Sequence, residues 1–377
     1  MILCPGSVRL SKGLPDDCTF EAAEGTVAHE LGSKALQYYS YEPWQDTGVT
    51  FKQEGHEITV DADMAAALEV YIGFCNRLRD EYLDTAGCQE YIEFEVDMAD
   101  LHPDIYGRLD YSLTTPEVIN MVDLKYGIGI VVEAPNNEQL MYYAACLVHK
   151  LARAGRQFAY DTPVRIIIVQ PRAPHPDGPI RIWQTTVQEV IYWVDDVLMP
   201  AIKASEDPDA KIITGEHCRY CLARTRCPAL NALAEEIADM EIMLGGDLLS
   251  LSDEELGERL ARFKPLSFLV KGMEDETYMR SMNGKDIPGF KLVPKRSDRV
   301  WKPGTEIVLE EAYGDDMYEG RKVCSPAQIA KKAGGKKIAK RYAYKPDTGL
   351  TLAPASDKRV AVRRSADDAF SDVVLPP

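Results

Sequence analysis

Long hydrophobic runs are missing from this 377-residue sequence. The longest apolar stretches, such as residues 164 to 169, are far shorter than the roughly 20 residues that cross a bilayer. The beginning of the chain also lacks the basic stretch followed by an apolar one that marks a secretory signal. We therefore expect a cytoplasmic protein with no membrane segment.

Two further absences narrow the class of protein. No G-x-x-x-x-G-K-[ST] phosphate loop occurs, and the nearest stretch, Gly334-Gly335-Lys336-Lys337, has the wrong spacing. No segment repeats at a fixed period. The sequence thus predicts neither a nucleotide-driven motor nor a repeat architecture.

Positive charge is also scarce, with 43 Lys and Arg against 60 Asp and Glu and a net charge of -17. Such a balance is unusual for a nucleic-acid-binding protein, because binding depends on cations that neutralise phosphates. The exception runs from Arg321 to Arg364 and holds 13 Lys or Arg against two acids, Asp347 and Asp357. This basic segment fits a polyanion-binding surface, and a solvated Lys-rich surface explains it equally well.

The rest of the composition, 45% hydrophobic and 27% charged, is typical of a globular protein, and the length predicts two domains or slightly more. We place the first domain at residues 1 to 240 and a basic accessory region at residues 245 to 377. In the accessory region, Ser252 opens a helix with a capping box, and Pro265 is expected to start a second helix.

The most informative stretch lies between residues 107 and 143. Two short apolar runs, residues 107 to 113 and 117 to 124, flank a turn-like Thr-Thr-Pro segment and predict a hairpin. Antiparallel pairing through this turn brings Asp110 and Asp123 side by side. A helix is expected after the second strand.

Two carboxylates held this close repel each other unless a cation lies between them. A divalent ion such as Mg²⁺ prefers oxygen ligands and often combines one or two carboxylates with phosphate oxygens. Lys125 follows Asp123 by two residues and lies on the same strand face, from where it could reach an attacking water or a phosphate. An ordinary Asp-Lys pair on a solvent-facing hairpin fits these residues equally well.

The helix after the hairpin carries Gln139 and Tyr143, which are four residues apart and therefore share one face. An amide and a phenol in this arrangement could hydrogen-bond a phosphate backbone. A core-facing Tyr beside an exposed Gln is the alternative.

Taken together, the G-x-x-D strand, the D-x-K strand and the Q-x-x-x-Y helix resemble the RecB-like branch of the PD-(D/E)XK nuclease superfamily. The upstream stretch from Glu24 to Glu30, which includes His29, matches the metal-binding histidine motif of that branch. The likeness covers about residues 1 to 230, and a phage and prophage family of uncharacterised proteins beginning near CPGSVRL is especially similar. Asp123 stands where the branch usually has Glu, as the superfamily formula permits.

This resemblance implies a restriction-endonuclease-like core, a mixed central sheet flanked by helices, and a site that holds one or two Mg²⁺ or Mn²⁺ ions. The implied metal ligands are His29, Asp110, Asp123 and the Leu124 carbonyl. Lys125 would position the nucleophile or stabilise the pentavalent state. Gln139 and Tyr143 would hold the DNA strand in register.

Nine cysteines in a chain with no expected export indicate thiol chemistry rather than a disulfide framework. Cys218, Cys221 and Cys227 have C-x2-C-x5-C spacing, and three thiolates need a fourth ligand to close a zinc site or to hold a 4Fe-4S cluster. Cys4 would supply the fourth thiolate, and His217 could replace one thiolate at a zinc site.

The one-plus-three cysteine pattern is similar to that of the iron-sulfur RecB-like nucleases, among them the CRISPR-adaptation nucleases and the AddB subunits. The resemblance therefore implies a 4Fe-4S cluster that joins the two ends of the nuclease domain. The other five cysteines are expected to be ordinary thiols: Cys18, Cys75, Cys88, Cys146 and Cys324.

Further elements are expected on either side of the hairpin. Residues 20 to 39 predict a helix, and residues 64 to 84 predict a helix with a core-facing apolar stripe. Residues 90 to 98 alternate as a strand with Glu93 and Glu95 on one face. Glu95 is a candidate for an additional metal-site acid, and the solubility of an edge strand explains it equally well.

Beyond the helix of Gln139, strands are expected at residues 164 to 169 and 181 to 187, and a helix at residues 188 to 204. In the basic segment, residues 325 to 329 and the lysines after them predict a small helix that touches DNA.

The expected activity is that of a divalent-metal-dependent DNA exonuclease or end-processing enzyme in phage replication or recombination. Its substrate would be single-stranded DNA or DNA with a free end, its location the host cytoplasm, and its partners a phage helicase, polymerase or annealing protein. A catalytically silent module that binds DNA ends or recruits a partner, with a structural metal or cluster, is one alternative. A hydrolase of small phosphate esters is another, which the basic segment disfavours.

Overall fold

The computed structural model describes residues 1–16, 19–244, 251–296, 299–302, 304–319, 322–345 and 349–362. Four residues named above lie outside these ranges: Cys18, Arg321, Asp347 and Arg364. The chain forms two compact units. The first comprises residues 1–214 and 221–223, and the second comprises residues 215–220 and 224–377.

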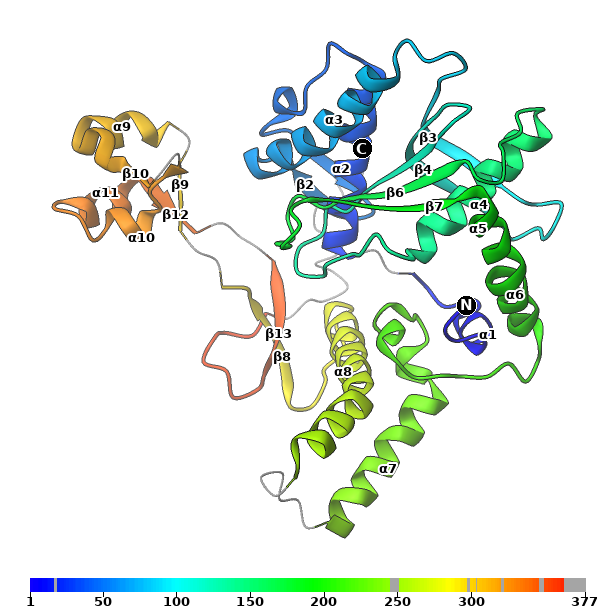
Figure 1. Ribbon diagram of the computed structural model, residues 1–377. Coiled ribbons are helices and arrows are strands. Elements are labelled where there is room, and N and C mark those ends of the chain that lie inside the picture. Colours follow the sequence, from blue (N-terminus) through cyan, green and yellow to red (C-terminus); the bar gives the residue numbers. More distant parts are fainter. Residues whose placement is uncertain are drawn as a thin grey trace, which may run out of the picture. The chain divides into compact units, whose positions relative to one another are not determined.

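The first unit is built on a five-stranded sheet with the order β3-β4-β5-β6-β7 (Figure 1). Its strands are β3 Gln89–Asp97, β4 Tyr106–Thr114, β5 Ile119–Leu124, β6 Pro163–Val169 and β7 Ile180–Thr186. β4 and β5 form the expected antiparallel hairpin, whereas β5 and β6 run parallel because α4 (Glu138–Arg153) connects them. The expected mixed α/β sheet is thereby confirmed.

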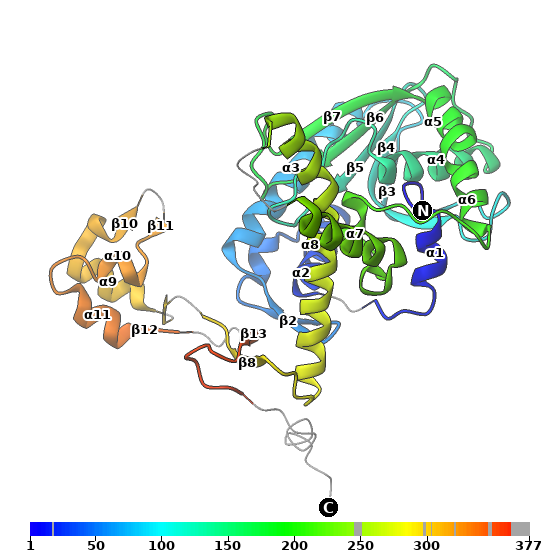
Figure 2. The same cartoon turned by 90° about the horizontal axis from the view of Figure 1, so that it is seen from below.

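Helices cover both faces of this sheet, as Figures 1 and 2 show from two directions. α2 (Phe20–Gln37) and α3 (Ala62–Tyr82) pack on one face, and α4 and α5 (Val187–Trp193) pack on the other. The helix expected at residues 188 to 204 consists of three consecutive segments. α5 is followed by a π-helical turn at Val194–Leu198 and then by α6 (Met199–Glu206). The helices expected near residues 20 to 39 and 64 to 84 are confirmed.

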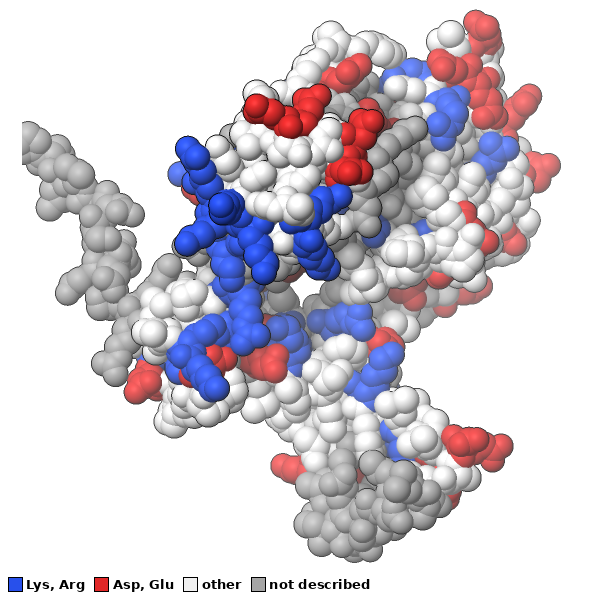
Figure 3. Space-filling view, turned by 90° about the vertical axis from the view of Figure 1, so that its left-hand side faces the viewer, with Lys and Arg blue, Asp and Glu red and all other residues white. Residues whose placement is uncertain are grey.

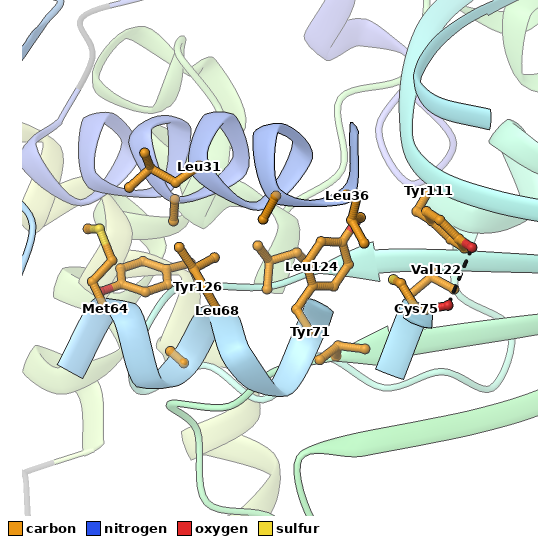
Figure 4. Packing of buried hydrophobic residues seen from close by; sticks show 14 of the residues in the cluster. Leu31, Leu36, Met64, Leu68, Tyr71, Cys75, Tyr111, Val122, Leu124 and Tyr126 are labelled. Atoms are coloured by element: carbon orange, nitrogen blue, oxygen red, sulfur yellow. Dashed lines mark hydrogen bonds between the residues drawn. The ribbon is translucent and has the colours of Figure 1, made fainter. Parts of the chain in front are cut away.

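Large apolar side chains fill the layer between α2, α3 and the sheet (Figure 4). Leu31, Leu68 and Tyr71 are almost completely buried there. The hydroxyl of buried Tyr111 lies 3.5 Å from the Cys75 carbonyl oxygen. Burying one large apolar side chain stabilises a fold by about 1.5–3 kcal/mol, so this layer fixes α2 against the strands that carry the acidic residues.

The remaining elements of the first unit are short. They are α1 Gly6–Ser11, a 3-10 helix at Pro43–Asp46, and the antiparallel pair β1 Thr50–Gln53 and β2 His56–Thr59.

The second unit contains two 3-10 turns, η3 (Glu216–Tyr220) and η4 (Arg224–Arg226), and two long helices, α7 (Pro228–Leu244) and α8 (Asp253–Met282). Both turns and α7 contact α8. For this reason residues 224 to 240, which we assigned to the first domain, group with the second unit.

α8 begins at the expected capping box, where the Glu255 carboxylate accepts a hydrogen bond from the Ser252 amide at 2.9 Å. The expectation that Pro265 starts a separate helix is wrong, because α8 runs through it without a break. Proline forfeits the hydrogen bond to the residue four positions earlier. Burial of Pro265 together with Phe268 and Leu269 offsets this loss.

Short elements form the rest of the second unit. The paired strands are β8 Phe290–Pro294 with β13 Leu350–Pro354, β9 Val300–Trp301 with β12 Ala343–Tyr344, and β10 Tyr318–Glu319 with β11 Lys322–Val323. The helices are α9 Thr305–Tyr313, η6 Gly314–Met317, α10 Pro326–Ile329 and α11 Gly335–Tyr342. A small core of Leu309, Met317, Cys324 and Ile329 holds α9 and α10 together. Across the described ranges of both units, every helix is too short or too polar to cross a membrane.

Candidate metal centre

Three potential metal ligands meet between α2 and the strand pair β3 and β4. One donor atom each from His29, Glu93 and Asp110 lie within 4.8 Å of one another. Nδ1 of His29 is 3.4 Å from Oδ1 of Asp110. Ligands at about 2.1 Å from one ion are at most about 4.2 Å apart. A small closing movement would therefore let all three residues share one divalent ion.

Glu93 reaches this cluster through an irregularity of β3. Its φ of +47° lies in the left-handed region, which is uncommon for residues other than glycine and often marks functional sites. The ladder pairs Ile92 with Tyr111 and Phe94 with Leu109, and it leaves Glu93 opposite the unpaired position of Asp110. The strained residue and the central acid thus lie across from each other.

The side-chain alternation of β3 shifts at this position. Ile92 packs on the side of α2 and α3, whereas Phe94 and Val96, which would share its face in a regular strand, pack on the side of α4. β4 shifts in the same way, because Leu109 packs on the α4 side and Tyr111 packs on the α2 side. Both strands are thus irregular at the positions that bring Glu93 and Asp110 close to His29.

Asp110 is fixed by the backbone of the neighbouring strand. Its Oδ2 accepts a hydrogen bond from the Leu124 amide at 2.8 Å, while its Oδ1 faces the histidine. The β4–β5 register pairs Tyr111 with Val122 and places Asp110 opposite Asp123 one step further along. Asp110 and Asp123 therefore lie on neighbouring strands, as the hairpin predicts.

Asp123 is the most deeply buried acid of the group, with 2% of its surface exposed. Its Oδ2 has no hydrogen-bond partner, and the Lys125 ammonium nitrogen contacts it at 2.9 Å without hydrogen-bond geometry. Burial raises the pKa of Asp123 to about 6, and the charge of Asp110 adds to the rise, against the opposing effect of Lys125. A buried carboxylate oxygen without a hydrogen bond is costly, and a bound cation would satisfy it.

The pKa values of the other two candidate ligands, His29 and Glu93, are also shifted by burial and by nearby charges. Burial lowers the pKa of His29, but the contact with Asp110 and the nearby negative charges outweigh burial, so the net pKa is raised. Burial raises the pKa of Glu93, and the charge of Asp110 raises it further. Without metal the cluster therefore tends to hold protons, which a divalent ion would displace.

Lys125 connects the acids to α4. Its ammonium nitrogen donates to Oε1 of Gln139 at 2.7 Å, and Nε2 of Gln139 donates to the Tyr143 hydroxyl at 3.4 Å. Asn137 caps α4 by accepting a hydrogen bond from the Leu140 amide at 3.0 Å, which fixes where Gln139 enters the helix. The lysine is held between a carboxylate and an amide, with a quarter of its side chain exposed.

Gly107 on β4 makes room for Tyr143. A Cβ atom added to Gly107 would lie 2.8 Å from Cε1 of the Tyr143 ring, closer than such atoms normally approach. The glycine of the G-x-x-D sequence thus lets α4 lie against the strand three residues before Asp110.

The loop between Lys125 and α4 is anchored by a buried cation. Arg181, 5% exposed, donates from Nε and Nη2 to the Val132 carbonyl at 3.0 and 2.7 Å. Gln170 donates to the Ile130 carbonyl at 2.7 Å. Arg181 on β7 and Gln170, directly after β6, thereby fix the segment that joins Lys125 to Gln139.

The six side chains that the sequence singled out make contacts in two groups. His29 contacts Asp110, and a chain of contacts runs from Asp123 through Lys125 and Gln139 to Tyr143. Leu124 contributes its amide to Asp110, and a metal-binding role of its carbonyl stays a prediction. Glu93 was missed in this role. Glu95, the suggested additional acid, is 80% exposed, and an Arg108 nitrogen lies 3.9 Å from it.

The cysteines of the predicted cluster lie in both units. Cys4 and Cys221 belong to the first unit, and Cys218 and Cys227 belong to the second. Cys4, Cys218 and Cys227 are buried and Cys221 is half-buried. Sγ of Cys4 accepts a hydrogen bond from the Ile213 amide at 3.3 Å.

Cys218 has a similar backbone donor, since the Gly215 amide donates to its Sγ at 3.4 Å. Gly6 packs against the carbonyls of Ala210 and Lys211, so the segment around Cys4 lies beside the segment that leads to the other three cysteines. A four-thiolate site stays a prediction.

A mixed sheet with helices on both faces and a cluster of carboxylates around a histidine define an α/β protein with a candidate divalent-metal centre. By sequence, the chain belongs to the family described as Protein of unknown function (DUF2800), whose model matches residues 2–360. The match includes the metal centre in the first unit and α11 in the second.

Proposed function

We propose that this protein is a divalent-metal-dependent DNA nuclease of the PD-(D/E)XK type, acting as an exonuclease or end-processing enzyme. The observation that carries this proposal is the buried carboxylate of Asp123, which pairs with Lys125 at 2.9 Å, beside a cluster of three potential metal ligands. Carboxylates and a histidine suit a divalent ion, and a lysine on the same strand suits a reaction in which negative charge develops.

Mg²⁺ or Mn²⁺ fits the donor set of His29, Glu93 and Asp110, and we propose Asp123 as a fourth ligand. When bound, such an ion would supply Lewis-acid chemistry toward a phosphate and a water molecule. The carbonyl of Leu124, at the end of β5, is a further proposed ligand. Because Asp123 is buried and Asp110 is held by a backbone amide, these ligands are already oriented in the absence of the ion.

The chain's own residues would act around the scissile phosphate. Lys125 would place its ammonium near the attacking water or the phosphate oxygens, where it stabilises the charge of the transition state. Gln139 orients Lys125 through the 2.7 Å hydrogen bond, and Tyr143 supports Gln139. Gln139 and Tyr143 would also contact the DNA strand and keep it in register.

DNA with a free end, or single-stranded DNA, is the substrate we propose, in phage replication or recombination. Support comes from the basic segment of an otherwise acidic chain, since a hydrolase of small phosphate esters would not need it. A phage helicase, polymerase or annealing protein would be the partner, and the host cytoplasm the location.

A 4Fe-4S cluster held by Cys4, Cys218, Cys221 and Cys227 completes the proposal. Backbone amides donate to two of these sulfurs, as they commonly do to cluster-bound cysteines. Protein purified without oxygen should contain about four iron atoms per chain and lose them in a Cys221→Ser variant. Stoichiometric zinc in place of iron would contradict the cluster.

The activity is tested with linear and closed circular DNA of the same sequence, incubated with Mg²⁺, Mn²⁺ or EDTA. Release of acid-soluble nucleotides from the linear form alone, abolished by EDTA, is the expected result. Asp110→Asn and Lys125→Ala should lose it, whereas Asp104→Asn, at an exposed position of the same unit, should retain it.

DNA that stays intact with every divalent ion, in the presence of well-folded protein, would refute the nuclease proposal. DNA binding that persists in EDTA under those conditions would identify a DNA-binding module that uses a nuclease fold.

A further inference from the structure

Helix α11 has one cationic face and one buried face. Four residues of this eight-residue helix are exposed cations: Lys336, Lys337, Lys340 and Arg341. At about 100° per residue they fall within an arc of about 140° around the helix axis. The other four positions are buried or half-buried: Gly335, Ile338, Ala339 and Tyr342. The face that α11 exposes to solvent is therefore cationic.

The helix is fixed tightly to its surroundings. Gly334, with φ of +71°, turns the chain between α10 and α11, and a Cβ atom added to Gly335 would overlap the Ile329 carbonyl oxygen. At the other end, the ammonium of Lys302 donates to the Arg341 carbonyl at 3.1 Å. The cationic face is thus held in place by glycine contacts at one end and a capped carbonyl at the other.

In the part of the chain that the structure describes, no ion pair joins these four cations to an acid. Exposed acids nearby in sequence belong to α9 and η6 instead: Glu306, Glu310, Glu311, Asp315 and Asp316. In Figure 3, Lys and Arg side chains gather into a patch, and a group of Asp and Glu lies apart from it. The charges of α11 are therefore available to an external polyanion.

We propose that α11 binds the phosphate backbone of double-stranded DNA through these four cations, independently of base sequence. This inference rests on the proposed function, in which DNA is the substrate, and adds that the bound DNA is double-stranded. A surface of this kind is needed because the metal centre is lined by carboxylates, which repel phosphates until a cation is bound. The chain as a whole, at a net charge of -17, repels DNA as well.

Duplex phosphates fit this face better than other ligands do. The exposed arc offers no aromatic platform on which single-stranded bases could stack, since the Tyr342 ring is half-buried, with the Arg341 guanidinium 5.3 Å from its centroid. The arc also lacks the exposed apolar side chains with which helices enter a membrane surface. Duplex DNA carries one phosphate charge per roughly 1.7 Å, so a helix about 12 Å long meets several.

The test measures binding of the full-length protein to a fluorescent DNA duplex in EDTA, over a range of salt concentrations. The variant replaces all four cations: Lys336→Gln, Lys337→Gln, Lys340→Gln and Arg341→Gln. Glutamine is a good helix former, so α11 should persist. We expect weaker binding at every salt concentration. The slope of log K against log salt should become shallower by about 3.6, at 0.9 per phosphate contact.

A control variant carries the same loss of four charges at exposed positions elsewhere: Lys12→Gln, Lys52→Gln, Lys203→Gln and Lys285→Gln. It should keep the wild-type salt slope. An unchanged slope in the α11 variant, or an equal loss in both variants, would overturn the inference. Because binding is measured without metal, its failure is distinguishable from failure of the nuclease proposal, which is decided by cleavage with metal.

Discussion

At the scale of a single residue, Asp123 lowers the stability of the fold and also serves as a proposed metal ligand. Its position at the end of β5 keeps it buried beside Asp110, which raises its pKa to about 6. The same position would offer a divalent ion a carboxylate oxygen whose neighbour is the Lys125 ammonium at 2.9 Å. Buried charged residues that lower the stability of a metal-free fold often serve the function of the protein.

The first prediction concerns this cost in metal-free protein. Because the folded-state pKa of Asp123 lies above the ordinary value of 3.8, the folded state retains the proton longer than the unfolded state. Stability should therefore fall as pH rises from about 4 to about 6, and it stays lower above that range. Asp123→Asn should remove this loss and stabilise the protein at pH 7.5 by on the order of 1–3 kcal/mol.

Urea unfolding in EDTA at acidic and neutral pH measures the effect. Asp104→Asn, at an exposed position, serves as the control and should change little. An Asp123→Asn protein that is less stable than wild type at neutral pH would show that Asp123 is already satisfied without metal.

The second prediction separates two glutamates of one strand. Glu93 lies in the ligand cluster, whereas Glu95 is largely exposed. Mn²⁺ should raise the melting temperature of wild type by an amount that grows with the ratio of the free Mn²⁺ concentration to its dissociation constant. Glu93→Gln should weaken the apparent Mn²⁺ affinity at least about tenfold, as loss of metal-site partners typically does.

Glu95→Gln should leave the Mn²⁺ titration unchanged. Equal titration curves for both variants would remove Glu93 from the site.

The sequence predicts most of this site but not Glu93, for a physical reason. Asp110, Asp123 and Lys125 follow from hairpin pairing and strand alternation, which are local rules. Glu93 and Glu95 occupy equivalent positions under the same rule, so alternation alone cannot choose between them. The left-handed conformation of Glu93, imposed by packing on both faces of β3, decides which one turns inward.

At the scale of elements, the site depends on how α4 lies against β4. Tyr143 occupies the space above Gly107 that any side chain would take. The network from Lys125 through Gln139 to Tyr143 therefore depends on a missing Cβ atom on β4, the strand next to the one that Lys125 follows.

The third prediction follows from this contact. Gly107→Ala should displace the Tyr143 ring and destabilise the protein by about 1–3 kcal/mol, the usual cost of overpacking. In a double-mutant cycle with Tyr143→Ala, most of that cost should disappear, because the clash is gone. Chemical unfolding of the four proteins measures the coupling. Additive effects in the cycle would show that Gly107 does not act through Tyr143.

The fourth prediction concerns the loop that precedes α4. Buried Arg181 donates to the carbonyl of Val132 and also to Oε1 of Gln170, and no carboxylate is among these acceptors. Arg181→Ala should cost about 2–4 kcal/mol because buried carbonyls lose charged donors. Hydrogen exchange should rise in residues 126 to 136. Arg165→Ala is the control. It removes a hydrogen bond from β6 of the same sheet to the Tyr82 hydroxyl at the end of α3, and it should leave that loop protected.

Helix boundaries show where local signals suffice and where packing overrides them. The Ser252 capping box predicts the start of α8 correctly, since its two hydrogen bonds are local. The prediction at Pro265 is wrong because the proline costs the helix one hydrogen bond, and the burial of apolar residues of α8 around it stabilises the helix by more.

At the scale of the whole molecule, the two proposed activities belong to different units. Every residue of the metal centre lies in residues 1–214, and α11 lies in the second unit. Variants of one unit therefore test catalysis and variants of the other test DNA binding. Because the chain as a whole has a negative net charge, DNA binding has to come from a local basic surface, and variants of α11 test that surface directly.

The most direct test of the central claim is cleavage of a DNA duplex labelled at one end, beside the Asp123→Asn variant, in Mn²⁺ and in EDTA. We predict a ladder of products shortened from one end in Mn²⁺, absent in EDTA and absent in the variant although the variant is more stable. A ladder of equal intensity from Asp123→Asn, or intact DNA with wild-type protein in Mn²⁺, would contradict a metal-dependent nuclease centred on Asp123.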